Sequence, residues 1–335
     1  MSETSRRGFL FAAGAAAAAP ALAAPQNPGI SAANTTPRRA YSMKLGVHMT
    51  NWQNLWRKGV ISWEEIGKVS AQLGFHGIEL QQDNVENASK QELKRIKDAL
   101  TSQGLQIRAI NINNNFLAPD FDGQIKMVRD FAELCAYFEA PLERIYLGRK
   151  PAEMAGPQAF DLVRKGLDTC LPIWEKFNVV AAPEPPDVFR FVPAAAGNGP
   201  NSPPGSFEFV RDQYPAGDIT AIVSLLRVVN SKYFRYTLDT GCIPPEEKYI
   251  WPQLLAPYTV NMHIKEWQFH WRTNEPVDTD YVRFLEPFKR AGYDGFLDLE
   301  LRDPVRGGFD LGSTIEEVSA KLTKLRVYLE RCIAA

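Results

Sequence analysis

The chain has 335 residues, of which 45% are hydrophobic and 23% are charged, and this composition excludes collagen-like, low-complexity and wholly disordered proteins. Its 38 Lys and Arg nearly balance its 39 Asp and Glu, which gives a formal net charge of −1. A nearly neutral chain lacks the positive field that draws proteins onto phosphate backbones, so we expect no nucleic-acid partner.

The first residues have the pattern of an export signal. Residues 5–10 read Ser-Arg-Arg-Gly-Phe-Leu, an Ala-rich apolar stretch follows, and Ala21-Leu22-Ala23 resembles a cleavage site. Residues 1–23 are therefore predicted to be a twin-arginine signal, with the export machinery as a partner and a periplasmic or secreted mature protein. An uncleaved helical anchor is the alternative, but no apolar run reaches the roughly 20 residues of a membrane span.

Residues 24–42 are rich in Pro, Asn and Thr and are predicted to form a tether. In an oxidising compartment the four cysteines could pair, although the sequence does not indicate how. From residue 43 to residue 335 the pattern alternates between short apolar runs and longer amphipathic stretches, and no second domain is evident.

The apolar runs predict eight strands, namely Leu45–Met49, Gly77–Leu80, Gln106–Ile112, Arg144–Leu147, Val179–Pro183, Tyr236–Leu238, Val260–Ile264 and Phe296–Leu299. The amphipathic stretches predict eight helices, namely Ser62–Leu73, Lys90–Thr101, Gln124–Phe138, Gln158–Lys176, Ile219–Val229, Glu246–Leu255, Asp280–Ala291 and Ile315–Arg331. Eight such units predict an α/β fold with a single (β/α)8 TIM barrel over residues 43–335. An open doubly wound sheet is disfavoured because no glycine-rich phosphate loop follows the first strand.

One predicted loop is unusually long. Residues 185–217, after the fifth strand, are rich in Pro, Gly and Asn and contain Phe189, Phe191, Phe207 and Phe209. Most βα loops have about two to six residues, so a loop of this length is either functional or disordered. In a TIM barrel it rises from the active-site face, where it would form a lid or a pocket wall.

Four consecutive predicted strands end in a side chain that can bind a metal. These side chains are Glu184, Asp239, His263 and Glu300. Each alone has an ordinary structural explanation, but the carboxyl ends of barrel strands converge on the active site. Three carboxylates would repel one another without a cation, so we expect one divalent ion, with Mn, Mg or Co favoured and Zn or Fe as alternatives.

These residues carry a resemblance to the sugar phosphate isomerase/epimerase family, the xylose isomerase-like TIM barrels. The similar segments are Leu73–Leu80, Leu238-Asp239-Thr240-Gly241, His263-Ile264-Lys265, and Gly292–Gly295 leading to Glu300. The resemblance implies that the four strand-end residues bind one divalent metal and that Glu184 and Glu300 move the proton. Two positions depart from the family's epimerases, since Cys242 replaces a substrate histidine and Pro185-Pro186 replaces an asparagine-histidine pair.

The predicted chemistry is proton abstraction next to a carbonyl through an enediolate, which gives a metal-dependent isomerase or epimerase. A lyase that eliminates a group from a 3-keto-sugar or glycoside is the first alternative, and a secreted sugar-binding barrel without turnover is the second. Abasic-site endonucleases of the same fold need several histidines for three zinc ions, whereas this chain has four His in all. Export favours a carbohydrate that is not phosphorylated.

Further side chains are predicted to bind this substrate. Glu79 ends the second strand, His48 lies on the first, and Lys265 shares a strand face with His263. Trp267 could supply an apolar wall for a sugar face, although aromatic side chains more often pack in the core. The sequence leaves open whether the chain forms a homo-oligomer.

Overall fold

The structure is a computed structural model of the chain, and it describes residues 42–185, 189–192, 206–209, 218–265, 279–301 and 312–335. The predicted export signal and tether, most of the loop after the fifth strand, and Trp267 therefore lie outside the described residues. None of the described helices is long and apolar enough to cross a membrane.

Eight parallel strands form one sheet in the order β5-β4-β3-β2-β1-β10-β9-β8. Their bounds are β1 Lys44–His48, β2 Gly77–Gln81, β3 Gln106–Asn111, β4 Leu142–Ile145, β5 Val180–Pro183, β8 Tyr236–Asp239, β9 Thr259–Ile264 and β10 Phe296–Leu299. A parallel bridge between Ala181 of β5 and Phe234, two residues before β8, connects the two ends of that order. The sheet is thereby closed on itself, which confirms the predicted TIM barrel.

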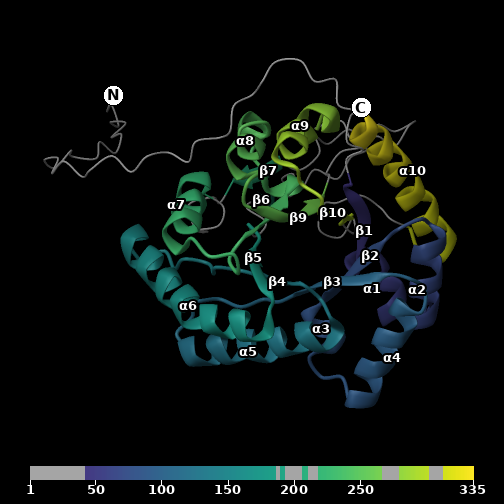
Figure 1. Cartoon of the computed structure of the whole chain (residues 1–335), viewed down its shortest axis with the longest axis horizontal. Helices are drawn as coiled ribbons and strands as arrows, with labels where there is room; N and C mark the ends of the chain where they lie inside the picture. Colours follow the sequence, from purple (N-terminus) through teal and green to yellow (C-terminus); the bar gives the residue numbers. More distant parts are fainter. Residues whose placement is uncertain (1–41, 186–188, 193–205, 210–217, 266–278, 302–311) are drawn as a thin grey trace, which may run out of the picture. The chain divides into compact units, whose positions relative to one another are not determined.

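The helices lie outside the ring of strands (Figure 1). They are α1 Thr50–Arg57, α2 Trp63–Gln72, α3 Gln82–Val85, α4 Lys90–Thr101, α5 Phe121–Phe138, α6 Gly156–Phe177, α7 Ile219–Val229, α8 Trp251–Leu255, α9 Tyr281–Ala291 and α10 Ile315–Ala334. Cap residues set several of these bounds. Ser62 accepts a hydrogen bond from the Glu65 amide at the start of α2. Gly74 follows the end of this helix in the left-handed region, with φ +84°.

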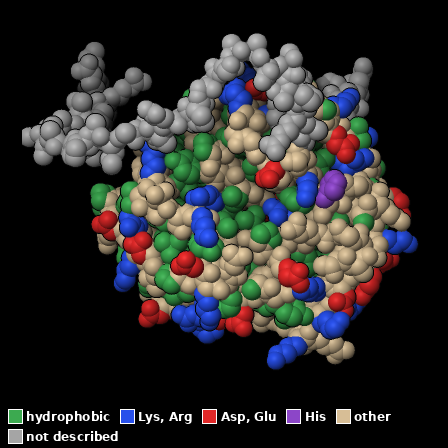
Figure 2. Space-filling model, viewed as in Figure 1, with side chains coloured by type: hydrophobic (Ala, Val, Ile, Leu, Met, Phe, Trp, Pro, Cys, Tyr) green, Lys and Arg blue, Asp and Glu red, His purple; other side chains and the backbone are tan. Residues whose placement is uncertain are grey.

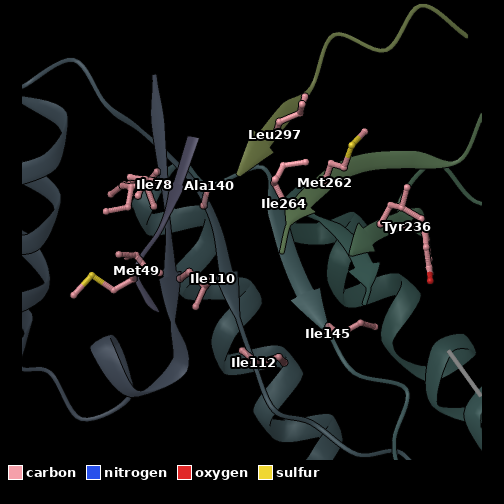
Figure 3. Packing of buried hydrophobic residues seen from close by; sticks show 14 of the residues in the cluster. Met49, Ile78, Ile110, Ile112, Ala140, Ile145, Tyr236, Met262, Ile264 and Leu297 are labelled. Carbon is pink, nitrogen blue, oxygen red and sulfur yellow. The ribbon is translucent and has the colours of Figure 1, made fainter. Parts of the chain in front are cut away.

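Alternation along most of the strands separates an apolar outer face from a polar inner face. On β9, Met262 and Ile264 pack in the apolar cluster between strands and helices, and on β10 Leu297 does the same (Figure 3). Their neighbours in sequence, such as His263 and Asp298, point into the barrel instead. The outer face therefore supplies the hydrophobic core, while the inner face is free to carry polar side chains.

The sequence prediction misplaced two elements. Strand β4 begins and ends two residues before the predicted Arg144–Leu147. It ends early because the Asn114 side chain accepts a hydrogen bond from the Tyr146 amide and donates one to the Tyr146 carbonyl. These bonds replace strand pairing at Tyr146. The predicted helix Glu246–Leu255 is two pieces, a 3-10 turn at Pro245–Glu247 and α8, each with a proline in its first turn.

Other elements were not predicted. Helices α1 and α3 are short and follow β1 and β2 directly. Within the long loop after β5, strands β6 (Phe189–Val192) and β7 (Ser206–Phe209) pair antiparallel, with Phe189 opposite Phe209 and Phe191 opposite Phe207. The alternating phenylalanines are thus the paired positions of a hairpin.

On the face shown in Figure 2, acidic and basic side chains are interspersed among apolar ones. This distribution agrees with the near-zero net charge of the chain. All four cysteines are described and none is in a disulfide bond.

Glu143 of β4 faces outward into the helix layer and is fully buried. Its Oε2 accepts a hydrogen bond from Trp174 Nε1 of α6 at 2.6 Å, while Oε1 has no partner among the described residues. Burial raises the pKa of the Glu143 carboxyl well above its usual value, and the bond from Trp174 offsets this only in part. The carboxyl therefore stays protonated in the fold at pH values where the unfolded chain ionises it.

Because this folded-state pKa is raised, stability from Glu143 is greatest below the unfolded pKa and falls as pH rises. We predict that Glu143→Gln, which keeps an acceptor for Trp174, raises the free energy of unfolding at pH 7 by ~1–3 kcal/mol. The gain shrinks as the pH approaches 4.5, the ordinary pKa of the carboxyl. Denaturant unfolding across this range checks it, with Glu133→Gln on the exposed face of α5 as control. A gain independent of pH would contradict the prediction.

Candidate active site and metal centre

The four predicted metal ligands converge inside the barrel. Glu184 follows β5, Asp239 ends β8, His263 lies on β9 and Glu300 follows β10, and one ligand atom from each lies within 4.8 Å of the others. All four are buried. Because these strands are neighbours around the barrel and β8 adjoins β5, their carboxyl ends bring the side chains to one point.

The imidazole of His263 connects two levels of the site. Its Nδ1 lies 2.8 Å from Glu184 Oε1 and 3.1 Å from Glu300 Oε2, among the candidate ligands. Its Nε2 lies 2.9 Å from Glu79 Oε2, deeper in the barrel. Both nitrogens therefore face carboxylates, and only Nδ1 faces the side where the candidate ligands meet.

Glu79 has no exposed surface and accepts hydrogen bonds at both oxygens. Asn111 Nδ2 donates to Oε2 at 2.9 Å, and Asn261 Nδ2 donates to Oε1 at 2.5 Å. With His263 also bonded to Oε2, the carboxylate is held in one orientation. The arrangement matches the carboxylate–histidine pairs that orient metal-binding imidazoles in other proteins. The predicted contact of Glu79 with substrate stays a prediction.

Two cations lie among the carboxylates. Lys265 Nζ is 2.5 Å from Asp239 Oδ2, 3.2 Å from Glu300 Oε2 and 3.6 Å from Glu184 Oε1. Arg144 of β4 forms an ion pair with Glu184, with Nε 3.1 Å from Oε2. These fixed positive charges offset part of the negative charge that the strand ends bring together. Lys265 and His263 thus share one face of the chain at β9, as predicted.

The pKa values reflect this balance of charges. Burial would raise the pKa of Glu184, but attraction to His263, Arg144 and Lys265 holds it below its usual range. Burial also disfavours the charged form of Glu300, yet attraction to Lys265 and His48 lowers its pKa well below normal. Both glutamates are therefore ionised at neutral pH.

Asp239 and His263 shift the other way. Burial raises the pKa of Asp239 to about 7, and although Lys265 opposes this shift, Glu184 and Glu300 add to it. Burial would lower the pKa of His263, but attraction to Glu79 and Glu184 raises it well above its usual value. The imidazole is therefore protonated in this arrangement and donates toward carboxylates on both sides.

His48 lies beside this cluster on β1. Its Nδ1 is 2.7 Å from Thr50 Oγ1, and its Nε2 is 2.6 Å from Asn111 Nδ2. Burial lowers the pKa of His48 to about 4, so the ring is neutral at pH 7. The backbone amide of Thr50 also donates to Nδ1 at 3.3 Å, so this nitrogen accepts a hydrogen bond. His48, His263 and Glu300 also form a second, overlapping group of potential ligands.

The chemistry of the donors fits a single divalent ion. Three carboxylate oxygens and one imidazole nitrogen are a ligand set that suits Mn, Mg or Co, and Zn or Fe also bind such sets. The ligands come from four neighbouring strands. Lys265 and Arg144 carry two positive charges beside the three carboxylates of Glu184, Asp239 and Glu300, and a divalent ion would supply further positive charge. The identity of the metal stays a prediction.

Several residues of this cluster were not predicted from the sequence. Arg144 pairs with the candidate ligand Glu184, and Asn111 and Asn261 donate to Glu79. Asn261 is two residues before His263, so the strand period alone indicated that it shares the inward face. Cys242 was noted as a departure from the family pattern, and its thiol donates to Asp239 Oδ2 at 3.1 Å.

The comparisons with known proteins agree with this architecture. Residues 68–324 match the family model described as the xylose isomerase-like TIM barrel. The chain belongs to this family. No curated protein sequence matches it. The resemblance expected from the strand-end residues is thereby confirmed.

Solved structures of the same fold include several sugar enzymes. D-psicose 3-epimerase from Clostridium cellulolyticum H10, solved with D-tagatose, superimposes with a TM-score of 0.68 at 12% identity, over 88% of this chain and 100% of that one. The 3-keto-D-glucoside 4-epimerase YcjR from E. coli gives 0.62 at 12% identity, over 87% and 100%. The probable 3-DHS dehydratase AsbF from Bacillus anthracis gives 0.62 at 17% identity, over 86% and 99%. At these identities the likeness shows a shared fold.

We predict that Glu79→Gln weakens divalent-metal binding about 10–100-fold, because glutamine offers one acceptor oxygen where Glu79 offers two. Titration calorimetry with Mn²⁺ checks this, and the wild-type chain is expected to bind about one ion. Glu143→Gln, also buried but on the outer face of the barrel, serves as the matched control with unchanged affinity.

A purely structural role for Glu79 would lower the melting temperature and leave metal affinity intact, which contradicts the prediction. Three zinc ions per chain would contradict a mononuclear site.

Proposed function

We propose that this protein is a divalent-metal-dependent isomerase or epimerase that abstracts a proton next to the carbonyl of a non-phosphorylated sugar or sugar derivative. The observation that carries the proposal is the convergence of Glu184, Asp239, His263 and Glu300 within 4.8 Å. Two of these residues are ionised glutamates, which suit proton transfer. The structural neighbours, which include 3-epimerases and a 4-epimerase, support this class.

The proposed roles of the two glutamates follow from their surroundings. Arg144 holds one oxygen of Glu184, and the other oxygen faces His263. Glu300 emerges after β10, and its Oε2 faces Lys265 and His263. One carboxylate removes the proton and the other returns it. Return to the opposite face of the same carbon gives epimerisation, and return to the neighbouring carbon gives isomerisation.

A bound divalent ion supplies charge stabilisation for the substrate oxygens as the proton leaves. Glu184, Asp239, His263 and Glu300 would hold it, and Glu79 would keep His263 turned with Nδ1 toward it. Lys265, whose ammonium lies at the same point, is placed to bind a substrate oxygen as negative charge develops there. His48, which is neutral at pH 7 and lies beside Glu300 and His263, is proposed to line the substrate side of the site.

A lyase is the second candidate, because the same carbanion expels a leaving group on the next carbon. The structural neighbour described as a probable dehydratase favours it. Two departures from the epimerase substrate pattern also favour a lyase. They are Pro185-Pro186 after Glu184 and Cys242 after Asp239. Cys242 donates to Asp239, so this position supports a candidate ligand.

We predict that incubation with the substrate in D₂O, with Mn²⁺ added, places deuterium on the carbon next to the carbonyl. NMR of a panel of ketoses, 3-keto-sugars and glycosides checks this and separates isomerised, epimerised and eliminated products. Turnover without deuterium incorporation would overturn the proton-transfer mechanism.

Glu300→Gln is the companion variant, with an expected loss of turnover of about 10²–10⁴-fold. Metal content is measured alongside, so that a lost ion is not mistaken for a lost base. Glu133→Gln, an exposed change of the same kind, should retain full activity. A wild-type chain that binds sugars with no turnover of any panel member would indicate a binding protein instead.

We also propose that residues 1–23 direct export by the twin-arginine route, which would place the barrel in the periplasm or outside the cell. The support is the Arg6-Arg7 pair followed by an Ala-rich stretch. We predict that replacing both arginines with lysine abolishes appearance of the mature chain in the periplasmic fraction, with lysine substitution of Arg38 and Arg39 as the control. Equal export of both variants would contradict the signal.

A further inference from the structure

A cavity of about 420 Å³ opens at the end of the barrel opposite the candidate metal centre. Its lining includes the first residues of five strands, which are Lys44, Gln106, Leu142, Thr259 and Phe296. Glu184, Asp239 and Glu300 lie at the other ends of their strands. The two sites therefore belong to opposite mouths of the same barrel.

The side chain of Arg108 reaches across the interior of the barrel at this end. Arg108 lies on β3 and Phe296 on β10, with β2 and β1 between them in the sheet, yet the guanidinium carbon is 4.0 Å from the centre of the Phe296 ring. Gly77 makes room for both, because a Cβ there would lie 2.7 Å from Arg108 Cγ and 2.7 Å from Phe296 Cε1. This end of the barrel is thus shaped around a stacked arginine.

The charge on Arg108 has no close counter-ion. The residue is only 7% exposed, makes no ion pair within the described part of the chain, and its Nε has no hydrogen-bond partner there. A second cation, Lys44, lies over the same ring with Nζ 5.6 Å from its centre. Asp294 lies at the rim, and Asp298 attracts Arg108 from deeper in the barrel without forming an ion pair. Burying an unpaired guanidinium is costly, and a bound anion would offset that cost.

We propose that this cavity is a second ligand site, which binds a small oxyanion on the guanidinium of Arg108 with Lys44 at the rim. A planar guanidinium fixed on an aromatic ring presents its N–H groups in one plane, which suits the two oxygens of a phosphate or carboxylate group. The cavity is large enough for such a group attached to a small metabolite. The proposal is independent of the reaction at the other end of the barrel.

The test measures the binding of inorganic phosphate to the full mature chain by calorimetry and by the shift in melting temperature, at constant ionic strength maintained with chloride. Phosphate is expected to bind and to raise the melting temperature, and Arg108→Gln is expected to weaken the affinity about tenfold or more. Lys44→Gln should weaken it less, since Lys44 lies at the rim. Arg129→Gln, an exposed change of the same kind on α5, should leave it unchanged.

Malonate is then titrated in place of phosphate, to distinguish a site for carboxylates from a site for phosphates. Binding of either ligand supports the site if the binding depends on Arg108. If Arg108→Gln is poorly folded, the Lys44→Gln and Arg108→Lys variants carry the comparison. An equal shift with chloride alone, or phosphate affinity that is the same in wild type and all three variants, would overturn the proposal.

Discussion

The structure depends on how the barrel accommodates negative charge in its interior. Glu79, Glu184, Asp239 and Glu300 are all buried inside one ring of strands, and carboxylates in such a setting are stable only when cations and hydrogen-bond donors surround them. Lys265, Arg144 and His263 supply the positive charge, and Asn111 and Asn261 supply donors to Glu79. The apolar outer face of the strands leaves the interior free for this network, so stability and chemistry are assigned to opposite faces of the same strands.

The sequence predicted the barrel and its four strand-end residues because both follow from short-range patterns. Short apolar runs that alternate with amphipathic stretches indicated the strands, and a side chain that can bind a metal at the end of a run indicated the active-site face expected in this fold. These rules need no knowledge of tertiary contacts. The family match confirms the architecture that they predicted.

The residues that were missed depend on contacts between distant parts of the chain. Arg144 was placed at the start of a strand, whereas the strand ends one residue after it and Arg144 pairs with Glu184. The role of Glu79 likewise depends on Asn111 and Asn261 from two other strands. Arg108 is the extra residue of β3 where its register with β2 shifts, between the pairs Ile78–Ile107 and Glu79–Ala109, and the residue pattern did not indicate this bulge. In each case a long-range contact or a local shift of register determines the geometry, and neither can be predicted from the spacing of apolar residues.

The sheet closes between β5 and β8 through fewer paired residues than any other neighbouring pair of strands has. One bridge at Ala181 and Phe234 joins these strands, whereas each other neighbouring pair is held by a ladder of at least three paired residues. Glu184 follows β5 and Asp239 ends β8, so the two residues lie on the two sides of this junction. If Glu184 and Asp239 bind one divalent ion, as proposed, the ion would also connect β5 to β8 where the sheet has its fewest paired residues.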